Sequence, residues 1–204
     1  MIALVHAWWV VMLRGIAAVT IALIVLLQSH VSMTMVAVAF AAYIFADSVI
    51  CLLGVLVTGF CVCGALLLTG GLVGIAVTVV SLSDTRAAPQ NIHAAQIPMM
   101  IWAFVIGAVE VYSGIRFGLE MPMFQRSQFR DHQLARYSLP PERAYLLAGV
   151  VAVVFAIALL ALPMTSAGMA VPIIGLFAVA VGYLHIRGGL TLGTMRFDLF
   201  SPSS

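Results

Sequence analysis

Two stretches near the start of the chain decide the fold: WWVVMLRGIAAVTIALIVLL at residues 8–27 and FAAYIFADSVICLLGVL at residues 40–56. Each is an almost unbroken apolar run, and a helix needs about 20 apolar residues to cross the hydrocarbon core of a membrane. Each run also contains one charged residue, Arg14 in the first and Asp47 in the second. The two runs therefore predict two membrane-spanning helices that both carry a charge into the membrane.

The rest of the chain has the same composition as these two runs. Of its 204 residues, 64% are hydrophobic and 8% are charged, whereas soluble domains are usually about 45–50% apolar. We therefore expect an all-α integral membrane protein, in which residues 1–204 form a single membrane domain. The six transmembrane helices expected from the apolar runs cover residues 8–28, 33–57, 60–81, 97–118, 143–162 and 168–193.

The arginines indicate how the spans are oriented. With six spans, both chain ends and the basic loop 119–142 lie on one side of the membrane, and that side receives every arginine except Arg86. Because cytoplasmic loops are rich in basic residues, both termini are expected in the cytoplasm. Trp8 and Trp9 at the cytoplasmic end of the first span and Trp102 near the outer end of the fourth fit the two interfacial belts of aromatic residues. Arginine used without lysine points to a bacterial source, and so to the bacterial inner (plasma) membrane.

The six spans group into three repeated helical hairpins. The second helix of each hairpin contains a related segment, and these segments are AYIFADSVI (42–50), AVEVYSGIR (108–116) and GYLHIRGGL (182–190). Their alignment places Asp47, Ser113 and Arg187 in register. Each repeat has an even number of spans, so all three share one orientation, which argues against the inverted repeats of many transporters.

The chain also resembles a known family over almost its whole length, with the exception of the loop 119–142. The Arg-Gly-Ile at residues 14–16, with Tyr43 and Asp47 in the second span, resembles the HdeD family of small bacterial inner-membrane proteins. Ser48 stands where that family usually has glycine, and the proline usual after its first span is found only in the third hairpin, as Pro163. The resemblance implies a fold of repeated hairpins and a connection with acid resistance, with which the family is associated in enteric bacteria.

Four ionisable residues fall inside the expected spans, all in the cytoplasmic half: Arg14, Asp47, Glu110 and Arg187. An unpaired charge there costs about 2.5–3.5 kcal/mol on insertion scales. We therefore expect structural ion pairs, for instance Arg14 with Asp47 and Glu110 with Arg187. The alternative is a relay for protons or ions that uses Asp47 and Glu110 with His185. No ionisable group in the outer halves of these spans continues such a relay, so structural pairing is favoured.

Residues outside the spans suggest two further roles. His30 and His93 fall in outer loops, where histidines either sense pH or have no role. Arg126, Arg130 and Arg136 lie among apolar residues in the long cytoplasmic loop. They suit docking onto anionic membrane lipids or a partner protein, and equally a simple orientation signal.

The chain contains no motif of a known enzyme class. It has no nucleophile–base arrangement, phosphate-binding loop, metal-ligand set or dinucleotide motif, and so we expect no enzyme, metal, cofactor or nucleic-acid partner. The first hypothesis is a non-enzymatic accessory or scaffolding subunit of a larger envelope complex, linked to stress, acid resistance or lipid transport. Its partners would be membrane lipids and other membrane-protein subunits or a second copy of itself. The second hypothesis is a small proton-linked carrier or acid-resistance transporter that uses Asp47 and Glu110.

Overall fold

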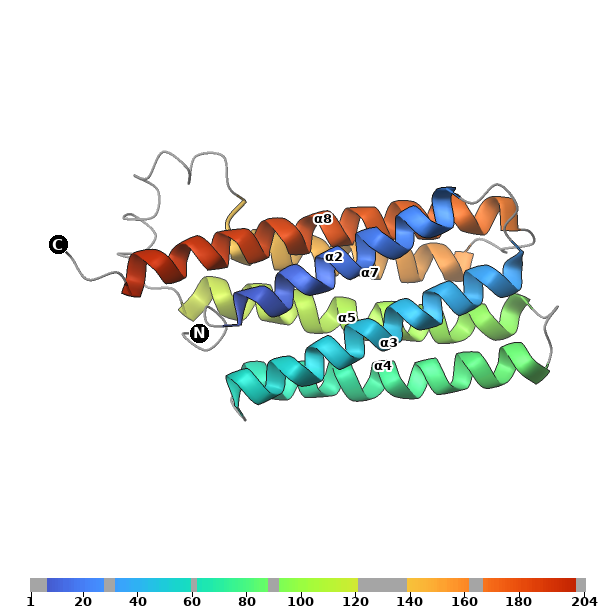
Figure 1. Cartoon of the computed structure of the whole chain (residues 1–204), viewed down its shortest axis with the longest axis horizontal. Helices are drawn as coiled ribbons and strands as arrows, with labels where there is room; N and C mark the ends of the chain where they lie inside the picture. The colour runs from blue at the N-terminus through green and yellow to red at the C-terminus, as the bar shows by residue number, and fades with distance from the viewer. Residues whose placement is uncertain are drawn as a thin grey trace.

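The computed structural model describes residues 7–27, 32–59, 62–87, 92–120, 139–161 and 167–200. Within these residues every regular element is an α-helix (Figure 1). The helices are α2 (Trp8–Leu27), α3 (Met33–Thr58), α4 (Val62–Ala87), α5 (Ile92–Glu120), α7 (Pro141–Ala161) and α8 (Ala167–Phe200). The expected all-helical fold is confirmed for this part of the chain.

All six helices are long and apolar enough to cross a membrane, and the chain is a multi-pass membrane protein. Their apolar segments agree with the expected spans to within a few residues. The helices themselves extend further, and α8 has 34 residues, or about 50 Å at 1.5 Å per residue. The hydrocarbon core is only about 30 Å thick, so the last turns of α8 lie beyond its apolar segment because helical hydrogen bonding continues where hydropathy falls.

The six helices form a closed ring. Each packs on the next along the chain, and α8 returns to pack along α2. Figure 1 shows them lengthwise and side by side, with the start of α2, the end of α3, the start of α4 and the end of α8 at the same end of the bundle. Within the ring order, α2 and α5 are opposite each other, and α5 and α8 are separated by α7.

The most extensive packing occurs between α2 and α8, between α5 and α7, and between α3 and α4. Two of these pairs depend on facing glycines. A Cβ atom on Gly15 would lie 2.6 Å from the carbonyl oxygen of Gly182, and a Cβ on Gly149 would lie 2.6 Å from that of Gly107. Any larger residue would therefore collide with the backbone of the neighbouring helix. Small residues allow this close approach of helices in membranes, where apolar surfaces gain little by leaving lipid.

The third pair uses a serine in place of one glycine. On α3, Ser48 lies against Gly71 and Gly74 of α4, and a Cβ on Gly71 would be 3.1 Å from the Ser48 carbonyl oxygen. The Ser48 hydroxyl donates to the carbonyl oxygen of Ile44 at 2.6 Å, so its hydrogen bond stays within its own helix. The residue is consequently small and internally satisfied, as a close helix contact requires.

These tight pairs join the second helix of one expected hairpin to the first helix of the next. Their glycine contacts also favour a register between α5 and α8 one residue away from the one expected from sequence. Gly114 and Gly189 face backbone nitrogens of the adjacent helix in the same way, at 2.8 and 2.9 Å from a built Cβ. When Gly114 of α5 is aligned with Gly189 of α8, Glu110 is aligned with His185. The threefold hairpin repeat itself stays a prediction.

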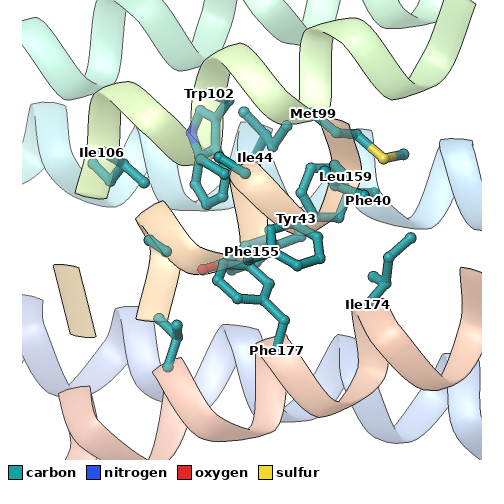
Figure 2. Close-up of a cluster of buried hydrophobic side chains, with 14 of the residues drawn as sticks. Phe40, Tyr43, Ile44, Met99, Trp102, Ile106, Phe155, Leu159, Ile174 and Phe177 are labelled. Atoms are coloured by element: carbon teal, nitrogen blue, oxygen red, sulfur yellow. The ribbon is translucent and has the colours of Figure 1, made fainter. Parts of the chain in front are cut away.

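A cluster of aromatic side chains fills one part of the ring interior (Figure 2). Phe155 of α7 and Phe177 of α8 are stacked with ring centroids 3.9 Å apart, and Phe40 and Tyr43 of α3 meet Trp102 of α5 edge to face. Trp102 is 2% exposed, so it belongs to this core. The expectation that it lies in an interfacial belt is wrong, because position along a helix gives the depth of a residue and not the direction in which its side chain faces.

The glycine contacts lead to a first prediction. Gly149→Ala places a methyl group 2.6 Å from both the Gly107 carbonyl oxygen and the Val111 nitrogen, and overpacking of this kind costs about 1–3 kcal/mol. We expect a clear fall in the thermal unfolding midpoint of the detergent-solubilised protein, measured by tryptophan fluorescence. Gly70→Ala is the matched control, because only the flexible end of Ile106, at 3.2 Å, faces that position. Equal losses in both variants would contradict the proposed backbone contact.

Candidate functional site: a buried ionic cluster

Four polar side chains from four different helices meet inside the ring. They are Arg14 of α2, Asp47 of α3, Glu110 of α5 and His185 of α8, each 5% exposed or less. Asp47 lies next to the aromatic cluster, since it follows Tyr43 by one helical turn. Helix packing therefore removes all four side chains from the lipid as well as from water.

Arg14 and Asp47 form a two-pronged ion pair. The Arg14 Nε donates to Oδ1 of Asp47 at 2.6 Å, and Nη2 donates to Oδ2 at 3.2 Å. Two parallel hydrogen bonds between a planar guanidinium and a carboxylate fix the orientation of both groups. The pair holds α2 to α3 at this depth.

The same guanidinium also reaches a second acid. Nη2 of Arg14 donates to Oε1 of Glu110 at 3.2 Å. Since α2 and α5 are opposite each other in the ring, this ion pair crosses the interior. The other carboxylate oxygen of Glu110, Oε2, makes no hydrogen bond with the described residues, so Glu110 is held through Oε1.

His185 completes the cluster from the fourth helix. Its Nε2 lies 2.8 Å from Oε1 of Glu110, and its Nδ1 lies 2.9 Å from the carbonyl oxygen of Val181, one turn earlier on α8. The ring of Tyr145 stands nearly perpendicular to the imidazole, with centroids 6.3 Å apart. Both ring nitrogens of His185 are thus engaged, and the ring cannot rotate without losing a contact.

Among the predicted site residues, the structure brings together Arg14, Asp47 and Glu110. Arg187 is half-buried on α8, two residues after His185, and positions two apart do not share a helix face. From the sequence, His185 is expected in the alternative relay but not in the ion pairs. A signal for it exists, because Gly107-x-x-Glu110-x-x-x-Gly114 and Gly182-x-x-His185-x-x-x-Gly189 have the same spacing.

The remaining predicted residues lie where the structure gives no account of their side chains. Arg126, Arg130, Arg136 and His30 are outside the described residues, and His93 lies in the first turn of α5 with its side chain undescribed. Within the described ranges, no group of three His, Cys, Asp or Glu residues is arranged to hold a metal ion. Chemically, the cluster can neutralise charge and hold or pass a proton.

Comparison with known proteins returned no relative: no family model, no curated protein and no solved structure matches this chain.

The ionic cluster leads to a second prediction, on stability. Arg14→Met leaves two buried acids without their cation, and breaking a buried ion pair costs about 3–5 kcal/mol. Adding Asp47→Leu should restore part of this loss, because Glu110 and His185 then remain as a balanced pair. Unfolding midpoints in detergent measure both effects. Ser48→Ala, next to Asp47 and equally buried, is the control and should change little. Simple addition of the two losses in the double variant would contradict the ion-pair account.

Proposed function

We propose that the chain is a non-enzymatic accessory or scaffolding subunit of a larger complex in the bacterial envelope. The observation that carries this proposal is that the charged groups of the interior contact one another, while the outer helix faces are apolar. Large hydrophobic residues are exposed on every helix, among them Leu27, Leu56, Val79, Phe104, Leu160 and Leu176. In a membrane such faces contact either lipid chains or the helices of a neighbouring protein.

The proposal includes how the chain sits in the membrane. The arginine distribution supports both termini in the cytoplasm of the bacterial inner membrane. Three repeated hairpins are supported by the common glycine spacing of α5 and α8. Membership of the HdeD-like family, and with it a role in stress, acid resistance or lipid transport, is supported by the Arg-Gly-Ile motif at residues 14–16 with Tyr43 and Asp47.

A partner search tests this function. The full chain, tagged at one end and extracted in mild detergent, should co-purify with a reproducible set of membrane proteins or with a second copy of itself. An unrelated six-span inner-membrane protein with the same tag serves as control for detergent-induced association. Recovery as a lone monomer, with no partner above the control and none trapped by cross-linking in intact cells, would overturn the proposal.

A small proton-linked carrier is the alternative function. The contact of His185 with Glu110 favours it, because Asp47, Arg14, Glu110 and His185 then form a continuous polar path across the ring interior. Such a path joins groups at similar depth, however, and a carrier needs access from both membrane faces.

Flux measurements distinguish the two functions. If the chain is a proton-linked carrier, Asp47→Asn and Glu110→Gln should abolish proton-coupled uptake in proteoliposomes while the protein still folds, as shown by its unfolding midpoint and elution volume. Ser48→Ala should retain the flux. Wild-type protein without measurable proton flux, or variants that lose expression rather than flux, would exclude the carrier and leave the structural role.

A further inference from the structure

We propose that the contact between Glu110 and His185 is a binding site for one exchangeable proton in the interior of the bundle. The inference goes beyond the accessory function, since it concerns the charge state of the cluster and holds with or without a partner protein.

Hydrogen-bond geometry provides the first argument. A backbone carbonyl oxygen only accepts hydrogen bonds, so the contact of His185 Nδ1 with the Val181 oxygen at 2.9 Å requires a proton on Nδ1. The contact of Nε2 with the Glu110 carboxylate oxygen at 2.8 Å also requires a proton between the two atoms. A neutral imidazole has only one N–H. Both contacts are satisfied together only when the Glu110–His185 pair holds one proton more than a neutral imidazole and a carboxylate.

Charge balance gives the same result independently. Arg14 is positively charged at every accessible pH, and Asp47 and Glu110 each contribute a negative charge when ionised. With a neutral His185 the four groups sum to −1, and with the additional proton they sum to zero. A net charge in this interior is costly, so the proton makes the cluster electroneutral. We place it on Nε2, because Oε1 of Glu110 also accepts from Arg14 and is best suited to that as a carboxylate.

The surrounding helices add no other charge to the pair. Facing it are Arg14 on α2, Asp47 with Tyr43 and Cys51 on α3, and Tyr145 on α7. The described side chains of α4 include no charged group. Two other arginines lie close by in sequence: Arg116, six residues after Glu110 on α5, and Arg187, two residues after His185 on α8, and both are half-buried. The balance of the interior therefore depends on this one proton.

Loss of the proton has a structural consequence. The proton links α5 to α8, which are separated by α7 in the ring. Without this proton the cluster sums to −1, and the single N–H of a neutral imidazole can serve only one of the two contacts, the one with Glu110 or the one with Val181. The additional proton therefore allows His185 to contact Glu110 of α5 and its own helix at the same time.

Nitrogen NMR of the full chain in lipid, with ¹⁵N-labelled histidine, tests the site. At neutral pH we expect both ring nitrogens of His185 to be protonated. In Glu110→Gln at neutral pH, only Nδ1 should carry a proton, because the balancing negative charge is gone. His185→Gln identifies the signal by its loss. Glu142→Gln, an acid at the end of α7 away from the cluster, is the control and should leave the spectrum unchanged.

Two results would overturn the proposal. A wild-type His185 with a single protonated nitrogen at neutral pH, and an ionised Glu110 by infrared spectroscopy, would show that the proton is absent. A Glu110→Gln variant whose His185 remains doubly protonated would show that the proton is held by other groups. Because the wild-type spectrum alone decides whether the proton is present, failure of a variant to fold leaves the test intact.

Discussion

The structure depends on the neutralisation of one buried guanidinium. Arg14 cannot lose its charge. Its side chain lies inside a bundle whose outer faces contact lipid, so the charge must be paired. No single helix supplies the required acids at the right depth: Asp47 comes from α3 and Glu110 from α5. Since α5 lies opposite α2, the second ion pair fixes the width of the ring as well as its closure.

The width of the ring is in turn set by its glycines. Gly15 follows Arg14 directly and brings the backbone of α2 against α8. Gly107 precedes Glu110 by one turn and does the same for α5 and α7. Helices with larger residues at these positions would stand further apart, and the arginine side chain would no longer reach both acids. The ion pairs in the interior therefore depend on the close packing between neighbouring helices.

Hydropathy alone was sufficient to predict the spans, because an apolar run of about 20 residues has few other stable structures. The position of a residue within its span also predicts its depth in the membrane, and Arg14, Asp47 and Glu110 are expected at similar depths. The direction in which a side chain points cannot be predicted in this way. Consecutive residues of a helix point about 100° apart, so His185 and Arg187 have nearly the same depth but point in different directions. The same limitation explains Trp102, whose depth fits an interfacial belt but whose ring faces the core.

Helices α3, α5 and α8 make similar close contacts through small residues, but each contributes a different polar side chain to the interior. Glu110 and His185 occupy equivalent positions, each three residues after one contacting glycine and four before another. On α3 the glycine position is taken by Ser48, and the acid precedes it by one residue. Three identical acids around Arg14 would leave two uncompensated charges, and three histidines would leave the arginine without a counter-ion. In this cluster Asp47 balances the charge of Arg14, and Glu110 faces His185. One proton on the Glu110–His185 pair then makes the whole cluster neutral. The difference between these polar side chains is thus what gives the proposed proton site a single proton.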